Sequence, residues 1–208
     1  MSRRAPMVGL GTGRCGTMSL ATIVNGCDKA DVTFEKYACP WYAECPKNIL
    51  LLVEKLDKLA DAGILAGEVG GYLLPHLEII RNAIPDLKIV WMERPIKDTV
   101  ESFMRWCVGE SRLRPQDKVR LGNQPQKIAP LPMIDAATPE QSWQFYCEMY
   151  HRHFEMVSPA AWLMQMEMLN NDACLNDLFG YLDIPEEDRV LPEQRQHNSF
   201  IEVANAVS

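Results

Sequence analysis

The feature that most restricts the fold of this sequence is the alternation of short apolar runs with longer amphipathic segments. Apolar runs that predict strands occupy residues 6–10, 31–35, 63–69, 87–93 and 161–167. The segments between them carry apolar residues at helical spacing, at residues 17–24, 47–62, 74–84, 139–157 and 171–182. Strands that alternate with helices are typical of an α/β protein with a parallel sheet. We therefore expect a three-layer sandwich around a central parallel sheet of about five strands.

A chain of 208 residues is long enough for one well-buried core, so we expect a single domain over residues 1–208. Residues 108–138 contain four prolines and little periodicity, which predicts a long loop or lid. Two helix starts are marked by proline: Pro95 suits the first turn of one helix, and Thr138 caps another that contains Pro139. Residues 185–208 are polar and predict a C-terminal tail.

Composition excludes several classes of function. The net charge of −7 argues against a protein that binds nucleic acid or membrane surfaces through general basic charge. No apolar run approaches the ~20 residues that span a bilayer, and the first residues do not form a signal peptide. The seven cysteines include no CxxC pair, and the four histidines lack the spacing of metal ligands. These features predict a cytoplasmic protein with reduced thiols and no bound metal.

The segment "GLGTGRCGTMSL", residues 9–20, is the strongest functional signal. A glycine-rich turn between a strand and a helix lets backbone N–H groups at the helix start approach an anion. The alternative is a tight turn with only a structural role. The residues that we expect to contact a ligand are Gly11, Thr12, Gly13, Arg14, Cys15, Gly16, Thr17, Met18 and Ser19.

This loop differs from that of a nucleotide triphosphatase. Thr17 stands where such a loop has the lysine that reaches the β- and γ-phosphates, and Met18 replaces the hydroxyl residue that binds Mg²⁺. The apolar strand at residues 87–93 also does not end in an aspartate that would help to hold the metal ion. A site that hydrolyses ATP or GTP therefore lacks two of its parts.

The segment "GTGRCGTMSL" resembles the 5′-phosphosulfate loop of sulfotransferases that use 3′-phosphoadenosine 5′-phosphosulfate (PAPS). In "ERPIKDTVESF", Arg94 and Ser102 stand eight residues apart, as in the family motif that grips the 3′-phosphate. Three further segments look like other blocks of this family: "FEKYACPWY", "GEVGGYLLPHLEII" and "WLMQMEMLNNDACLNDLFGYLDIPEED". The resemblance implies a P-loop-like α/β fold, PAPS as the sulfate donor and no metal.

Sulfuryl transfer requires that charge on the leaving phosphate be neutralised and that the acceptor lose a proton. Arg14 and the N–H groups around Gly16 are placed for the first task. Glu35, at the carboxyl end of a predicted strand, is the preferred base, although it could instead be an exposed carboxylate paired with Lys36. Glu68 is the second candidate for the base, or it braces a following loop.

Three other residues have weaker claims to a role. His76 ranks third as a base, because a lone histidine in a helical pattern is more often structural. Arg195 and Asn198 match a late loop that closes over the 3′-phosphate and adenine in related enzymes, but both could equally belong to a solvated tail.

The sequence thus predicts a PAPS-dependent sulfotransferase that modifies a hydroxyl or amine of a small or soluble acceptor. One rival is a P-loop kinase for a nucleotide or small molecule, which would need ATP and Mg²⁺. The other is a module that binds the nucleotide without catalysis. Neither the acceptor nor the oligomeric state is encoded in a pattern that we can read.

Overall fold

The computed structural model of the protein describes residues 2–39, 41, 47–106, 132, 134, 136–157 and 160–192. Its centre is one parallel five-stranded sheet with the strand order β2-β3-β1-β4-β5. The strands are β1 (Met7–Leu10), β2 (Ala30–Phe34), β3 (Leu65–Val69), β4 (Lys88–Glu93) and β5 (Trp162–Gln165). The predicted α/β class and the five-stranded parallel sheet are confirmed.

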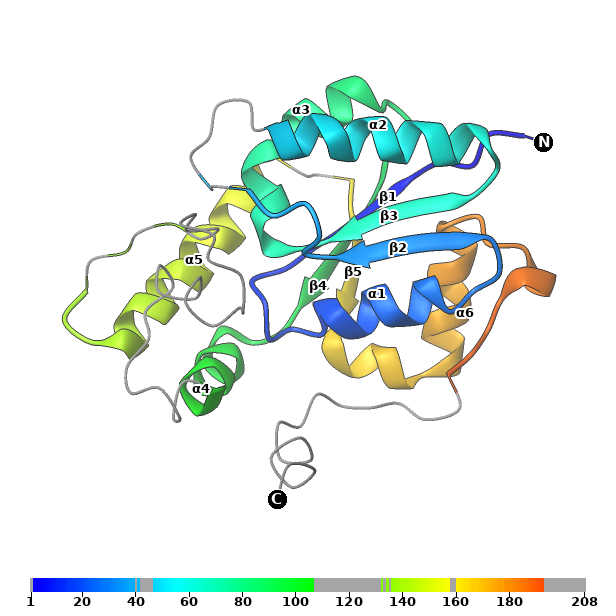
Figure 1. Cartoon of the computed structure of the whole chain (residues 1–208). Coiled ribbons are helices and arrows are strands. Elements are labelled where there is room, and N and C mark those ends of the chain that lie inside the picture. The colour runs from blue at the N-terminus through cyan, green and yellow to red at the C-terminus, as the bar shows by residue number, and fades with distance from the viewer. Residues whose placement is uncertain are drawn as a thin grey trace, which may run out of the picture.

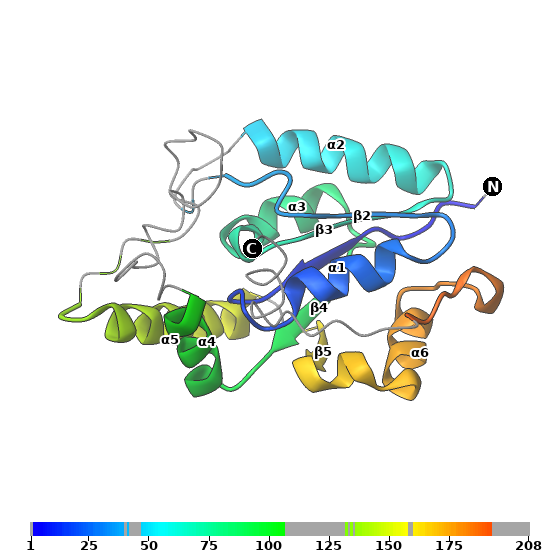
Figure 2. The same cartoon turned by 60° about the horizontal axis from the view of Figure 1, so that its bottom comes forward.

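Helices cover both faces of the sheet (Figure 1). The α-helices are α1 (Thr17–Asn25), α2 (Lys47–Asp61), α3 (Leu77–Ala83), α4 (Ile96–Trp106), α5 (Pro139–Val157) and α6 (Asp172–Tyr181). Shorter 3₁₀ turns are η1 (Gly71–His76), η4 (Met166–Asn170) and η5 (Glu186–Asp188). In Figures 1 and 2, α2 and α3 lie on one side of the sheet and α1 and α6 on the other, while α4 and α5 gather near its carboxyl edge.

Two apolar clusters correspond to these two faces. The larger joins the inner sides of α2, α3 and α5 to β1 and β4, and it contains the buried rings of Trp91, Trp143, Tyr146 and Tyr150. The smaller packs α1 and α6 against the other face of the sheet. All four residues of β1 are buried, as expected for a central strand of a parallel sheet that is covered on both sides.

The strand order reverses at β1. From β1 the chain passes through α1 to β2 and β3 on one side of the sheet, whereas β4 and β5 lie on the other side of β1. Ligands of open α/β sheets bind at the carboxyl edge where the strand order reverses. The glycine-rich segment leaves β1 at this edge, between β3 and β4.

Most predicted elements begin and end within two residues of the observed ones, with three differences. The predicted helix at residues 74–84 is divided into η1 and α3, because Pro75 has no N–H and falls inside the 3₁₀ turn. The last strand ends at Gln165, and the next five residues form η4. Pro95 precedes α4 rather than lying in its first turn. The predicted cap of α5 is present, since Gln141 N donates to Thr138 Oγ1 at 3.2 Å.

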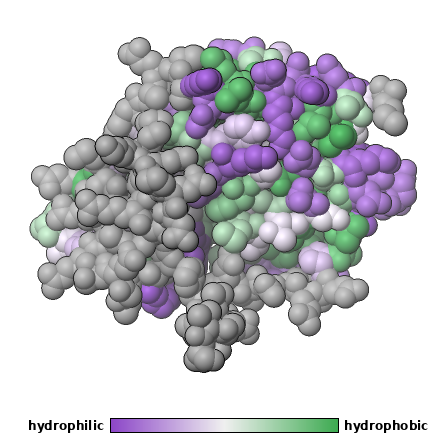
Figure 3. All heavy atoms as spheres, viewed as in Figure 1, coloured by the Kyte–Doolittle hydropathy of each residue, from purple (hydrophilic) through white to green (hydrophobic). Residues whose placement is uncertain are grey.

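Within the described ranges, no helix has the length and apolar character that crossing a membrane requires. Figure 3 shows hydrophilic side chains over much of the upper part of one face, around α2, with apolar side chains between them. Residues 108–131 and 193–208 lie outside the described residues, so the predicted lid, most of the predicted tail and the single-domain organisation remain predictions.

Candidate functional site

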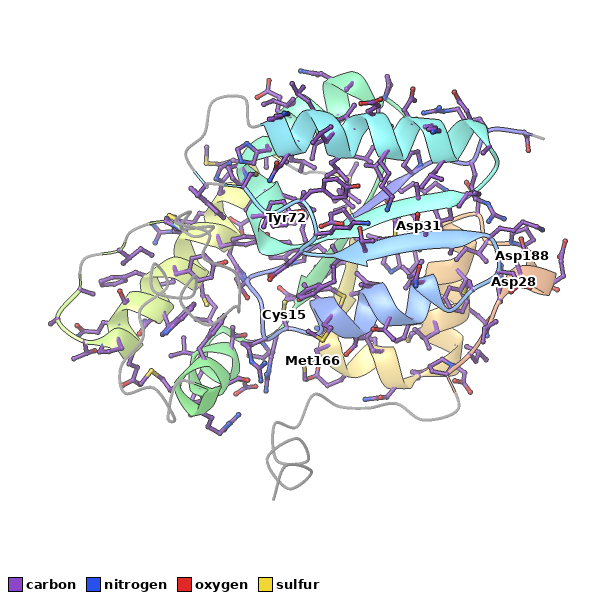
Figure 4. The ribbon with its side chains drawn as sticks, viewed as in Figure 1. Cys15, Asp28, Asp31, Tyr72, Met166 and Asp188 are labelled. Carbon is purple, nitrogen blue, oxygen red and sulfur yellow. The ribbon has the colours of Figure 1, made fainter. Side chains whose placement is uncertain are left out.

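Residues 11–16 form the turn between β1 and α1, and their backbone takes a conformation suited to an anion. Gly13, Arg14 and Gly16 all have positive φ values, of 85°, 56° and 91°. The left-handed conformation of Gly16 ends the turn and starts α1, a position that a residue with a Cβ occupies only with strain. Figure 4 shows Cys15 inside this turn and Met166, from η4, close to the start of α1.

The amino end of α1 offers its N–H groups to a ligand. Its N-cap residue, Gly16, supplies no side-chain cap, and the first turn contains no acidic residue. The first helical hydrogen bond runs from Leu20 N to Gly16 O at 2.9 Å, so the N–H groups before Leu20 have no acceptor within the helix. These N–H groups and the helix dipole favour a negatively charged ligand.

The two motifs that the sequence singled out meet in space. Arg14 Nε donates to Ser102 Oγ at 3.2 Å, and Arg94 Nη1 donates to the Arg14 carbonyl at 2.9 Å. The arginine that follows β4 therefore holds the loop backbone, while the loop arginine reaches across to α4. Arg14 after β1, Arg94 after β4 and Ser102 of α4 thus form one cationic junction at the carboxyl edge of the sheet.

Two buried polar atoms near this junction have no hydrogen-bond partner among the residues that the structure describes: Arg94 Nε and Thr99 Oγ1. Thr99 lies one helical turn before Ser102 on the buried side of α4, and its exposure is only 1%. Buried polar atoms are usually satisfied, and an exception often marks a place for a ligand or ion. Thr99 was not among the predicted site residues. The sequence signal that was available is that Thr99 precedes Ser102 by three residues, which puts both on the same side of a helix.

A hollow of about 400 Å³ adjoins Arg94 at the carboxyl ends of β4 and β5. Its lining comes from the start of α4, from α5 and from the residues around η4: Glu93, Arg94, Pro95, Ile96, His151, Gln165 and Glu167. Burial lowers the pKa of His151, although Glu93 and Glu155 act in the opposite direction. The size of the hollow is within the range of small-ligand sites.

Glu35 follows β2 at the same edge of the sheet. It is half-buried, has a φ of 48°, and its N–H donates to Val69 O at 3.0 Å, which fixes its backbone beside β3. Burial raises the pKa of Tyr150 well above its ordinary value, and the charge of Glu35 adds to that rise. The Glu35 carboxylate is therefore within electrostatic reach of a ring that contacts the loop. Its role as a base remains a prediction.

Glu68 lies at the end of β3, fully buried, and its carboxylate accepts several hydrogen bonds. The donors are Lys36 N at 2.7 Å, Tyr37 N at 3.3 Å, the Tyr72 hydroxyl at 2.6 Å and the Thr33 hydroxyl. These contacts fit the bracing alternative, and the loop that is braced follows β2 rather than β3. Burial raises the pKa of Tyr72 strongly, and the adjacent Glu68 charge contributes, so this hydroxyl stays protonated and donates.

Replacing Glu68 with glutamine is expected to destabilise the protein by about 1–3 kcal/mol, because the amide NH₂ cannot accept bonds that the carboxylate oxygens now accept. Chemical denaturation measures this change. Glu54→Gln is the control, since Glu54 is exposed on α2. Equal unfolding free energies for the two variants would contradict the bracing role.

The remaining candidate residues are distributed as follows. His76 is 2% exposed at the end of η1, so its ring is buried. The Cys15 thiol is also buried, which raises its pKa and leaves its backbone as the part that suits a ligand. Met18 is 46% exposed at the start of α1. Arg195 and Asn198 lie outside the described residues.

Two tyrosines of α5 contact the loop, and neither was predicted from the sequence. Gly11 N donates to the Tyr150 hydroxyl at 3.2 Å, and the Tyr146 hydroxyl donates to Thr12 O at 3.1 Å. Both side chains are fully buried. The available sequence signal was two tyrosines four residues apart, which places them on the same side of a helix.

The fold of the protein is similar to that of several solved structures, although its sequence is distant from theirs. No protein-family profile and no curated protein matches the sequence. The solved structure of a sulfotransferase from Alicyclobacillus acidocaldarius is similar, with a TM-score of 0.57 and 16% identity over 98% of this chain and 91% of that one.

Two more solved structures resemble the chain. A sugar kinase from Janibacter sp. HTCC2649 has a TM-score of 0.51 and 13% identity, over 91% of this chain and 99% of that one. A sulfotransferase from Mycobacterium avium has a TM-score of 0.51 and 11% identity, over 89% of this chain and 65% of that one. The protein therefore has the α/β P-loop-like fold that these sulfotransferases and this kinase share.

Proposed function

We propose that the protein is a sulfotransferase that moves the sulfuryl group of PAPS to a hydroxyl or amine acceptor. The observation that carries the proposal is the junction of Arg14, Arg94 and Ser102 beside the uncapped start of α1. One half of this junction is a loop suited to a 5′-phosphate. The other half has two buried polar atoms, Arg94 Nε and Thr99 Oγ1, that a second anionic group would satisfy.

Within this proposal each residue has a defined task. Arg14 and the N–H groups of Thr17 and Met18 neutralise charge at the 5′-phosphate side, with hydrogen bonds from the Thr17 and Ser19 hydroxyls. Arg94 and Ser102 hold the 3′-phosphate, and the hollow beside Arg94 has room for the nucleoside. PAPS supplies a sulfuryl group attached to a phosphate that can leave.

Glu35 is the proposed base for the acceptor. Its place after β2 puts it at the carboxyl edge of the sheet, two strands from the loop. A base must lie within hydrogen-bond reach of the proton that it removes, and a half-buried carboxylate at this edge can meet an acceptor that enters from solvent. Glu68 is the less suitable choice, because its oxygens already accept bonds from Thr33, Lys36, Tyr37 and Tyr72.

The second candidate function is a P-loop kinase, which the structural similarity to a sugar kinase favours. Against it stands the loop itself, since Thr17 occupies the place of the phosphate-binding lysine. A module that binds the nucleotide without catalysis is the third possibility.

A transfer assay separates these functions. The protein is incubated with pooled hydroxyl and amine acceptors, either with PAPS labelled in its sulfate or with ATP labelled in its γ-phosphate together with Mg²⁺. Sulfate label on an acceptor is the expected result, and it should be lost in Arg94→Ala. Transfer of phosphate label alone would replace this proposal with the kinase. Binding of the bisphosphate product without any transfer would favour the non-catalytic module.

A further inference from the structure

The glycine-rich loop is held by hydrogen bonds from a helix far away in the sequence. Gly11 and the Tyr150 hydroxyl are 139 residues apart, and Thr12 and Tyr146 are 134 residues apart. The two phenols bind the two peptide units on either side of the Gly11–Thr12 peptide: Tyr150 accepts from the N–H of the Leu10–Gly11 peptide, and Tyr146 donates to the carbonyl of the Thr12–Gly13 peptide. Rotating either peptide would break its bond, so the pair fixes the direction in which the loop leaves β1.

The surroundings of the two phenols restrict their movement. Tyr146 and Tyr150 lie 5.8 Å apart between ring centroids and contact each other edge to face. Tyr150 also stacks on Trp91 of β4 at 5.5 Å, and Tyr146 meets Trp143 at 5.8 Å. Buried aromatic rings packed in this way occupy single orientations, so their hydroxyl groups are held at fixed points.

Close packing of the η1 backbone against the loop and the two tyrosines completes this support. A Cβ added to Gly71 would lie 2.9 Å from the Gly11 carbonyl oxygen and 3.4 Å from the Tyr146 hydroxyl. The start of η1 therefore approaches the loop at a distance that only glycine allows. Gly11 is thus in contact with both η1, through its carbonyl oxygen, and α5, through its N–H.

The same tyrosines contact the segment that follows β2 and Glu35. Trp41 is 5% exposed, and its ring lies 6.4 Å from that of Tyr146 and 5.7 Å from that of Tyr150. The phenols thus stand between the loop proposed to bind the donor and the segment that carries the proposed base.

We propose that Tyr146 and Tyr150 are positioning residues that fix the Gly11 and Thr12 peptides in the orientation required to bind the phosphate of the donor. The identity of the ligand in this inference rests on the proposed function. The fixing of the loop backbone by the two tyrosines does not depend on that function. Their hydroxyl groups are fully buried and bind the loop backbone, so their proposed task is to hold the loop rather than to contact the ligand. They act by organising the loop before the ligand arrives, which lowers the entropic cost of binding.

The chain offers a matched control for this proposal. Tyr181 of α6 also exchanges hydrogen bonds with backbone: Ile89 N donates to its hydroxyl at 3.1 Å, and the hydroxyl donates to Ile89 O at 3.1 Å. Ile89 lies near the amino end of β4, at the opposite edge of the sheet from the loop. Tyr181→Phe therefore removes the same chemical group and similar backbone bonds without touching the site.

The test compares Tyr146→Phe, Tyr150→Phe and Tyr181→Phe, each of which keeps its ring. Titration calorimetry with 3′-phosphoadenosine 5′-phosphate is expected to give a dissociation constant about tenfold higher for the first two variants, as for the loss of one hydrogen bond. Tyr181→Phe should bind within about twofold of the wild type. All three should show similar decreases in melting temperature, which separates positioning from a general loss of stability.

Amide hydrogen exchange in the protein without ligand provides an independent measurement. The Gly11 N–H should exchange at least about tenfold faster in Tyr150→Phe than in the wild type or in Tyr181→Phe. Unchanged exchange at Gly11, or unchanged affinity in both loop-side variants, would overturn the inference. If the wild type itself binds none of the bisphosphate, the proposed function fails and the exchange measurement alone decides the role of the tyrosines.

Discussion

Replacing Arg94 with alanine is expected to raise the dissociation constant for 3′-phosphoadenosine 5′-phosphate about 100-fold, or about 2.7 kcal/mol. Arg94 has two roles in the site. Its Nη1 holds the Arg14 carbonyl at 2.9 Å, and its buried Nε has no partner among the described residues. The alanine variant loses a charge-assisted bond to the ligand and also frees the loop backbone. Titration calorimetry measures the change.

Two further substitutions show whether the loss of affinity comes from the guanidinium group of Arg94 or from the loss of any positive charge on α4 or before it. Arg94→Lys keeps the charge but loses the planar guanidinium fork, so it should recover only part of the affinity. Arg105→Ala is the matched control, because Arg105 lies on the exposed side of α4 with a side-chain exposure of 67%. If Arg94→Ala and Arg105→Ala bind the bisphosphate equally well, the second anion site is not at Arg94.

Replacing Glu35 with glutamine is expected to lower the rate of sulfuryl transfer by about 10²–10⁴-fold, the usual contribution of a general base. Glutamine has nearly the same shape, and the backbone of residue 35 is held by Val69 O, so the fold should not change. Binding of 3′-phosphoadenosine 5′-phosphate should stay within about twofold of the wild type, since the base does not hold the donor. The measurement combines single-turnover transfer with calorimetry.

The control for Glu35→Gln is Glu54→Gln, which makes the same chemical change on the exposed side of α2. This control should transfer at the wild-type rate. A Glu35→Gln variant that is as active as the control would exclude Glu35 as the base. Loss of donor binding together with transfer would instead assign Glu35 a structural role near the tyrosines of α5.

The strands and the loop could be predicted because their signals are local. β1 and β4 are short apolar runs buried on both faces, and two of the three positive φ values in the turn after β1 fall on glycines, Gly13 and Gly16. Arg94 and Ser102 were identified through the resemblance to the sulfotransferase motif in which an arginine and a serine stand eight residues apart. The division of the helix at residues 74–84 was missed, although Pro75 was visible, because apolar periodicity alone does not show where a 3₁₀ turn ends.

The support of the site could not be predicted, because it depends on tertiary contacts. Nothing near Tyr146 or Tyr150 in the sequence indicates that their hydroxyls bind peptides of the loop, more than 130 residues away. The contacts of Glu68 were hidden for the same reason. Its place at a strand end was predicted, but the backbone N–H groups that donate to its carboxylate belong to Lys36 and Tyr37, in the loop after another strand. Sequence patterns identify the groups that meet a ligand more readily than the groups that hold them.

The most direct test of the central claim is a thermal-shift titration of the wild-type protein with 3′-phosphoadenosine 5′-phosphate, ATP with Mg²⁺, and 5′-AMP. A ligand at about 100 times its dissociation constant stabilises the folded state by about 2.7 kcal/mol, which is roughly 5–10 °C for a domain of this size. We expect that shift with the bisphosphate and a much smaller one with 5′-AMP, which lacks the 3′-phosphate. A shift with ATP and Mg²⁺ but none with the bisphosphate would contradict the sulfotransferase account and favour the kinase.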